Sequence, residues 1–134
     1  MKFEVPGIPK AKGRPRMTRK GHVYTPAETV SFENLVKVCA REAGIEYAFE
    51  GPVSMTLTFV WPAKKLKRKG DPVGRQWKGT RPDLDNCIKA VCDALNGTAY
   101  LDDGQVVCVI AEKQYAAQGE APRTEVRIEA AEPA

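Results

Sequence analysis

Two aspartates, Asp83 and Asp85, stand in the segment 81–89, RPDLDNCIK, directly after a basic stretch of the chain. A surface that only binds a polyanion gains nothing from carboxylates, so another partner must neutralise them. In an extended segment, residues i and i+2 share a face, whereas in a helix they point about 200° apart. We therefore expect a helix that starts at Asp85 or Asn86, with Asp85 as its N-cap, so that both carboxylates face one cation.

Other charged residues extend this group. Asp102 and Asp103 form a turn before a predicted strand, which could return one of them to the same place. Lys89 lies four residues after Asp85, one helical turn away, where it could hold a scissile phosphate or the attacking water. Oxygen ligands without His or Cys favour Mg²⁺, with Mn²⁺ as a substitute. The chemistry predicted from these residues is metal-assisted phosphodiester hydrolysis.

Each of these residues also has a simpler interpretation. Asp85 could be an ordinary N-cap, with Asp83 favouring the positive end of the helix dipole. The segment 102–104, Asp-Asp-Gly, is a common turn sequence. Lys89 could form a helix salt bridge to Asp85 or Asp93.

Positive charge is concentrated in the first part of the chain. The net charge is +4, but residues 1–81 hold 17 Lys/Arg against 7 Asp/Glu, whereas the remainder holds 4 against 10. Fifteen of the 21 basic residues lie in two blocks rich in Gly and Pro, Lys2–Lys20 and Lys64–Arg81. We interpret the blocks as basic loops that bind nucleic-acid phosphates, rather than merely solvated loops. The predicted DNA contacts are Lys10, Lys12, Arg14, Arg16, Arg19, Lys20, Lys64, Lys65, Lys67, Arg68, Lys69, Arg75, Lys78 and Arg81.

Three other side chains have less specific interpretations. His22 is the only histidine and lies in the first basic block, where a phosphate contact or a bystander role is favoured over a catalytic base. Trp77, in the second block, could stack on an unpaired base. Trp61 is expected to close a core strand.

The remaining sequence predicts one α+β domain spanning residues 1–134. Strands are expected at 2–8 (an edge strand), 53–61, 105–113 (buried) and 124–129, from alternation or apolar runs. One helix is expected after a Thr25-Pro-Ala-Glu28 capping box, ending at Gly44. The helix that starts at Asp85 or Asn86 is expected to end at Gly97, because apolar residues at 84, 87, 88, 91, 92 and 95 match one helical face. We expect a small mixed, mostly antiparallel sheet with both helices packed on one face.

The chain is also expected to remain in the cytoplasm. Its longest uncharged apolar run, 53–63, is too short to cross a bilayer, and its start does not resemble a secretory signal. Its four cysteines at 39, 87, 92 and 108 show no metal-ligand spacing, and we expect them to be reduced core residues.

Several motifs taken together resemble the RusA-type Holliday junction resolvases, small endonucleases of phage and bacterial origin. They are Arg-Pro-Asp-Leu-Asp-Asn with a lysine three residues on (81–89), Asp-Ala-Leu-Asn-Gly (93–97) and Tyr-Leu-Asp-Asp-Gly-Gln-Val-Val (100–107). The segments 5–16 and 24–26 also look like those of phage-derived members. The resemblance spans nearly the whole chain.

This resemblance implies residue roles, a substrate and an assembly. Asp83, Asp85 and Asp103 match the metal-binding catalytic acids, Lys89 matches the essential lysine, and Asp102 is a supporting acid. Members of the family are Mg²⁺-dependent homodimers and use no small-molecule cofactor. They cut four-way DNA junctions in recombination and repair by paired nicks.

Two other functions stay open from the residues alone. One is a non-catalytic nucleic-acid-binding module, and the other is a hydrolase of small phosphorylated substrates, for which no glycine-rich phosphate cradle is present.

Overall fold

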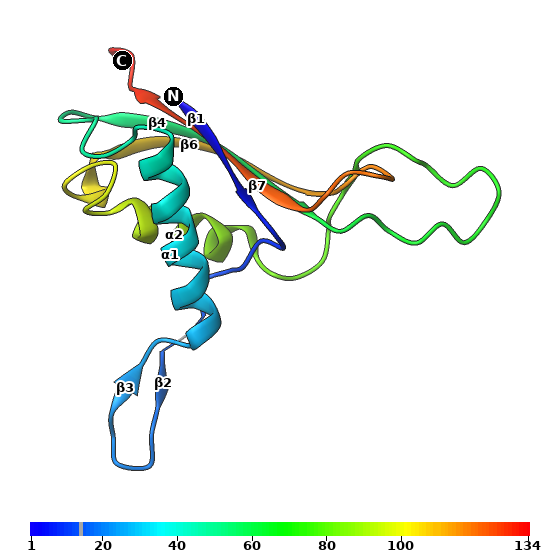
Figure 1. Cartoon of the computed structure of the whole chain (residues 1–134), viewed down its shortest axis with the longest axis horizontal. Helices are drawn as coiled ribbons and strands as arrows, with labels where there is room; N and C mark the ends of the chain where they lie inside the picture. Colours follow the sequence, from blue (N-terminus) through cyan, green and yellow to red (C-terminus); the bar gives the residue numbers. More distant parts are fainter. Residues whose placement is uncertain (14) are drawn as a thin grey trace.

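The computed structural model describes residues 1–13 and 15–134, and Figure 1 shows their arrangement. The two helices are α1 (Ala27–Glu42) and α2 (Leu84–Leu95), and η1 (Asp103–Gln105) is a short 3-10 helix. The strands are β1 (Lys2–Pro6), β2 (Arg16–Met17), β3 (Val23–Tyr24), β4 (Val53–Trp61), β5 (Gln76–Trp77), β6 (Val106–Tyr115) and β7 (Arg123–Ala130). Neither helix in the described ranges is long and apolar enough to span a lipid bilayer.

Five of the strands form one sheet in the order β1-β7-β4-β6-β5, and β2 pairs with β3 in a separate hairpin. Only β4 and β6 run parallel, while the other neighbours are antiparallel. Both helices lie on the same face of the sheet, and the β2–β3 hairpin projects away from it (Figure 1). The predicted α+β architecture is therefore confirmed, with β1 at the edge as expected.

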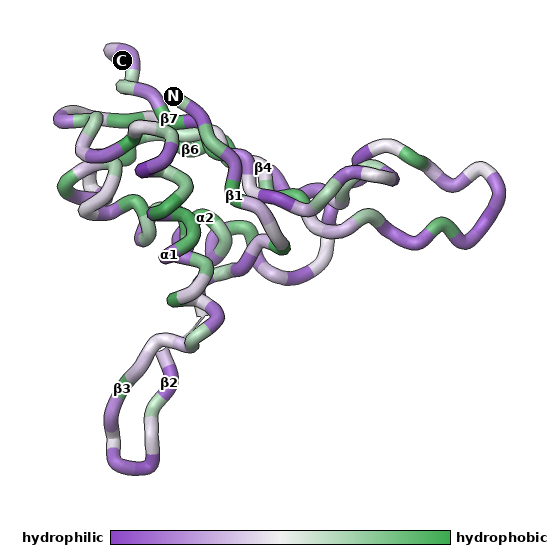
Figure 2. Tube along the Cα trace, in the orientation of Figure 1, coloured by the Kyte–Doolittle hydropathy of each residue, from purple (hydrophilic) through white to green (hydrophobic). Residues whose placement is uncertain are grey.

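The hydrophobic core lies between the helices and the sheet. Strand β4 follows the predicted bounds 53–61 and buries alternate side chains toward the helices, among them Met55, Leu57 and Phe59. Helix α2 presents Val91 and Leu95 to the same core. Apolar residues gather in this layer, whereas the two basic blocks extend from it as largely hydrophilic segments (Figure 2). Each fully buried Leu, Val or Phe stabilises the fold by roughly 1.5–3 kcal/mol, so the burial of Val91 and Leu95 holds α2 against the sheet.

The ends of α1 show one wrong and one correct prediction. The capping box at Thr25 is absent, because Pro26 is the N-cap, no side chain caps the helix, and α1 starts at Ala27. A residue before proline is held extended, which leaves Thr25 one position too early to cap. The helix ends at Glu42, and Gly44 with φ of +81° stops it as predicted.

The basic blocks contain short strands that the sequence does not predict. Each of β2, β3 and β5 has two residues, too few to show an alternating pattern. Strand β6 is also less buried than predicted, since Val107 and Ile110 are each 59% exposed. Ile110 lies opposite the exposed Thr56 of β4, on the face of the sheet away from the helices, and β5 pairs with only the last two residues of β6, Gln114 and Tyr115.

The cysteine prediction holds only in part. Cys87 is buried and Cys39 and Cys92 are half-buried, but Cys108 is exposed on β6, so its assignment to the core is wrong. All four are free thiols.

Candidate active site at the start of helix α2

Helix α2 starts at Leu84, so the expected start at Asp85 or Asn86 is wrong. Asp83 is the N-cap, in an extended conformation with φ −67° and ψ 141°. The carbonyl of Asp83 accepts the first helical hydrogen bond, from the N–H of Cys87 at 3.2 Å. The half-buried Leu84 packs against the core, which favours including it in the helix.

Neither aspartate at this end serves as a side-chain cap for the helix. The carboxylate of Asp83 makes no capping hydrogen bond, and Asp85 accepts only the adjacent N–H of Asn86 at 2.9 Å. Both side chains are exposed, and neither forms an ion pair with a described residue. The interpretation of Asp85 as an ordinary N-cap is therefore wrong, and both carboxylates remain open to a cation from solution.

The other pair of acids lies in a structured turn. The carboxylate of Asp102 accepts the N–H of Gly104 at 3.2 Å, and the side chain of Gln105 accepts the N–H groups of Leu101 and Asp102. The Gln105 amide also donates to the carbonyls of the segment 49–51. Asp103 is exposed, and no described residue forms an ion pair with it. Asp102 thus builds the turn, while the Asp103 carboxylate is uncommitted.

Asp103 does not join Asp83 and Asp85 in one cluster. Burial raises the pKa of Cys92 to about 11, and Asp103 contributes to this shift. Burial likewise raises the pKa of Cys87 to about 11, where Lys113 opposes the shift and Asp85 and Asp83 add to it. Within the described ranges, no group of three or more His, Cys, Asp or Glu converges closely enough to hold a metal ion.

The donors nevertheless fit a hard divalent cation by their chemistry. Asp83, Asp85 and Asp103 offer only carboxylate oxygens, which Mg²⁺ and Mn²⁺ prefer. All three are exposed. What the structure does not provide is their convergence into one coordination shell.

Lys89 pairs with Asp93 rather than approaching Asp85. Its Nζ lies 3.6 Å from Asp93 Oδ2, and its side chain is 60% exposed. The same Asp93 oxygen lies 3.3 Å from Lys12 Nζ, and Lys12 also bonds Glu33 at 2.6 Å. An exposed pair of this kind contributes at most about 1 kcal/mol, so the Lys89 ammonium can exchange Asp93 for a phosphate.

The first basic block contacts the start of α2 through its backbone. The N–H of Lys12 donates to the carbonyl of Asn86 at 2.9 Å. Beyond it, Arg14 lies outside the described residues. The β2–β3 hairpin then carries the exposed residues Arg16, Arg19, Lys20 and His22.

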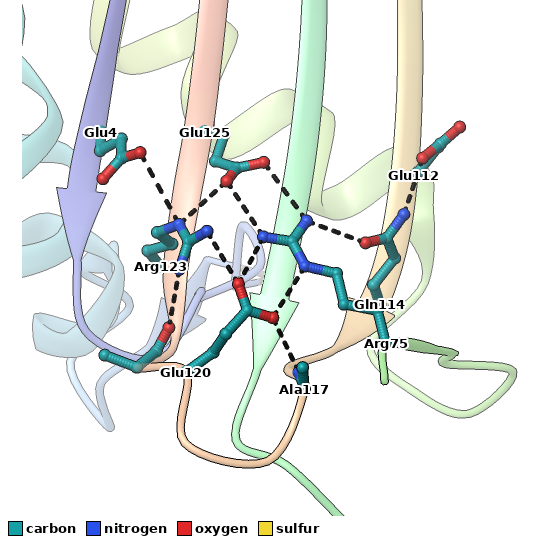
Figure 3. Close-up of polar contacts among 9 residues, drawn as sticks. Glu4, Arg75, Glu112, Gln114, Ala117, Glu120, Arg123 and Glu125 are labelled. Atoms are coloured by element: carbon teal, nitrogen blue, oxygen red, sulfur yellow. Dashed lines mark hydrogen bonds and ion pairs between the residues drawn. The ribbon is translucent and has the colours of Figure 1, made fainter. Parts of the chain in front are cut away.

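The second basic block, Lys64–Arg81, is tied to the sheet through Arg75 (Figure 3). Arg75 donates to both carboxylate oxygens of Glu120 at 2.9 Å and to Glu125 at 3.2 Å. Arg123 binds the same two carboxylates, at 3.0 and 2.9 Å. The hydrogen bonds from Arg75 lower the pKa of Glu120 to about 2. Arg75 is therefore already neutralised, whereas the exposed basic residues of this block are Lys64, Lys65, Lys67, Arg68, Lys69 and Arg81.

Sequence reasoning missed Lys113, which the fold brings to the residues before Asp83. Its Nζ donates to the carbonyls of Thr80 and Pro82, each at 2.7 Å. About thirty residues separate these groups in the chain, so only the packing of β6 beside α2 could have indicated the contact. For the tryptophans, Trp61 is buried as expected at 7% exposure, and Trp77 is 71% exposed.

Comparison with known proteins identifies relatives over most of the chain. Residues 6–129 match the protein family described as "Endodeoxyribonuclease RusA". The chain is 39% identical over 138 residues to "Uncharacterized protein YqaN" of Bacillus subtilis (strain 168), covering 96% of this chain and 94% of that protein. It is 31% identical over 109 residues to "Crossover junction endodeoxyribonuclease rusA" of Lactococcus phage r1t, covering 80% of this chain and 74% of that protein.

Proposed function

The chain belongs to the RusA family of endodeoxyribonucleases, and we propose that it is a Mg²⁺-dependent nuclease that resolves four-way DNA junctions by paired cuts. One observation supports this most directly. Asp83 and Asp85 stay exposed and without an ion pair among the described residues, although the N–H of Lys12 bonds the carbonyl of Asn86 and the Lys113 ammonium bonds that of Pro82. A nucleic-acid surface gains from such carboxylates only if they bind a cation.

The proposed roles follow the exposure and contacts of each side chain. Asp83, Asp85 and Asp103 would hold Mg²⁺ or Mn²⁺, and Asp102 supports them by shaping the turn. When bound, such an ion polarises a phosphoryl oxygen and lowers the pKa of a bound water. Lys89 would leave Asp93 to contact the phosphate that is cut.

The DNA would contact the exposed basic residues of both blocks. The hairpin and the second block project from the body in different directions, and the start of α2 lies between their bases (Figure 1). Lys12 and Arg75, which the sequence also assigned to DNA binding, have structural roles in this proposal because carboxylates already bind their charges.

Paired cuts require two active sites, and we propose that a symmetric homodimer supplies them. The described strands leave residues 106–112 of β6 with a partner on one side only. This edge exposes Val107 and Ile110 and has no proline. Such an edge favours pairing with a second chain, and antiparallel pairing with its own copy would satisfy a two-fold axis.

The test is cleavage of a synthetic four-way junction and a linear duplex, with Mg²⁺ or with EDTA. Wild-type protein should cut the junction only with Mg²⁺. Asp83→Asn should abolish cleavage while preserving or strengthening junction binding, because it removes a ligand and a negative charge together. Asp71→Asn, the same substitution at a turn of the second block, should cut normally.

Two results would contradict the proposal. Unchanged cleavage by Asp83→Asn would end the metal-site assignment. Junction binding without cleavage, insensitive to divalent ions, would instead support the non-catalytic binding module.

A further inference from the structure

Two lysines at the base of the second basic block share one aromatic ring. Lys64 Nζ lies 5.2 Å from the ring centre of Tyr115, and Lys78 Nζ lies 4.9 Å from it. Lys78 Nζ also lies 5.3 Å from the ring of Trp61. Distances below about 6 Å are those of cation–π contacts, which orient an ammonium group without neutralising it.

Hydroxyl groups connect these lysines to the candidate active site. Lys78 Nζ donates to Thr80 Oγ1 at 2.9 Å, and that oxygen lies 3.3 Å from the hydroxyl of Tyr115. The carbonyl of the same Thr80 accepts from Lys113, which also holds the carbonyl of Pro82 next to Asp83. The lysine pair therefore lies within a few residues of the acids.

No carboxylate among the described residues forms an ion pair with Lys64, Lys78 or Lys113. Lys64 helps to lower the pKa of Asp71, after the N–H groups of Lys67 and Arg68, but makes no ion pair with it. Ammonium groups that face one aromatic ring without a counter-charge favour a bound anion. Lys12 and Arg75 show the opposite arrangement, since carboxylates already bind them.

We propose that Lys64, Lys78 and Tyr115, the Tyr115 cluster, bind a phosphodiester of the DNA strand that enters the candidate active site. This inference rests on the proposed nuclease function and adds to it a specific backbone contact. The two ammonium groups supply the charge, and the ring of Tyr115 orients them. Lys113 is a positioning residue, because its ammonium is already committed to two backbone carbonyls.

The test compares the salt dependence of junction binding in two double variants. Lys64→Gln/Lys78→Gln removes the lysines of the cluster, and Lys37→Gln/Arg41→Gln removes the same charge from helix α1, outside both basic blocks. Binding is measured by fluorescence anisotropy of a labelled junction in EDTA, so that no cutting occurs. Each phosphate contact contributes about 0.9 to the slope of log affinity against log salt. Loss of two contacts should therefore lower the slope by about 1.8. Raising the salt from about 50 to 200 mM should then weaken binding by about 12-fold less than it does in wild type.

A second pair of variants tests the ring itself. Tyr115→Phe keeps the ring face and should bind the junction as tightly as wild type, within about twofold. Tyr115→Leu removes the ring that orients both lysines and should weaken binding several-fold. Circular dichroism and the fluorescence of the buried Trp61 check that each variant is folded.

The outcomes separate this inference from the proposed function. If wild type binds and cuts junctions but both double variants show the same slope, the cluster has no special role and the inference is overturned. Wild-type affinity in Tyr115→Leu would overturn it as well, even if the lysine variants fail to fold. If wild type does not bind junctions at all, the proposed function and the inference both fail.

Discussion

Replacing Glu120 by Gln tests whether the Arg75–Glu120 pair anchors the second basic block. Glu120 accepts two hydrogen bonds from Arg75, one from Arg123 and one from the N–H of Ala117 at 2.8 Å. Its pKa is lowered from 4.5 to about 2, chiefly by the hydrogen bonds from Arg75. Because the folded pKa lies below the unfolded one, the stabilisation is fully present above about pH 5. It is lost as the pH falls toward 2.

The pKa values set the size of the expected effect. A difference of one pH unit corresponds to about 1.4 kcal/mol, so the linkage has an upper bound of about 3 kcal/mol. The Glu120 side chain is 26% exposed, and water screens part of this interaction. We therefore expect Glu120→Gln to lower the free energy of unfolding by about 1–2 kcal/mol at pH 7. The difference from wild type should vanish near pH 2.

Urea denaturation at pH 7, 5, 4 and 3, followed by tryptophan fluorescence, measures this difference. Glu4→Gln is the matched control, since Glu4 lies 3.7 Å from Arg123 but is 65% exposed and should contribute little. A gap between wild type and Glu120→Gln that stays constant from pH 7 to pH 3 would refute the reasoning. It would mean that the variant loses packing rather than a charge-dependent interaction.

Two further predictions concern the DNA and the dimer. Alanine at both Arg14 and Arg16 should weaken junction binding by at least tenfold while changing the rate of the chemical step less, measured by anisotropy and single-turnover cleavage. Normal affinity with slow cutting would contradict it. Ile110→Lys should convert a dimer to monomers in sedimentation analysis, because a lysine at a strand edge opposes pairing. Its control is Thr56→Lys on the neighbouring strand β4, opposite Ile110 in register, and a dimer that survives Ile110→Lys would place the interface elsewhere.

The sequence predicts the fold well where a residue's neighbours along the chain decide its environment. Strand β4 has its predicted bounds because one of its faces meets the helices and the other meets solvent. Gly44 and Gly97 end the two helices with positive φ angles of 81° and 74°, which glycine adopts without strain. These signals are local, so periodicity and turn residues are enough to find them.

The site is less predictable because contacts between distant segments build it. Arg75 and Glu120 are 45 residues apart, and no local pattern indicates that they pair. The same holds for Lys113 and Pro82, 31 residues apart. The start of α2 shows a different error, since the start expected from the sequence is the position at which two acids would face one cation. Packing of Leu84 against the core and the N-cap position of Asp83 decided it instead.

This start of α2 bears on how a metal ion would be held in the proposed mechanism. Asp83 and Asp85 lie near the positive end of the helix dipole, which partly offsets their charge and lowers their need for a cation. Asp103 stands in a separate turn, which Gln105 ties to two carbonyls. Mg²⁺ commonly binds through one or two carboxylates and lets substrate phosphate complete its shell. The separation of Asp103 therefore favours an ion that is held weakly by the free protein and firmly only with DNA, so that cutting would depend on the junction being in place.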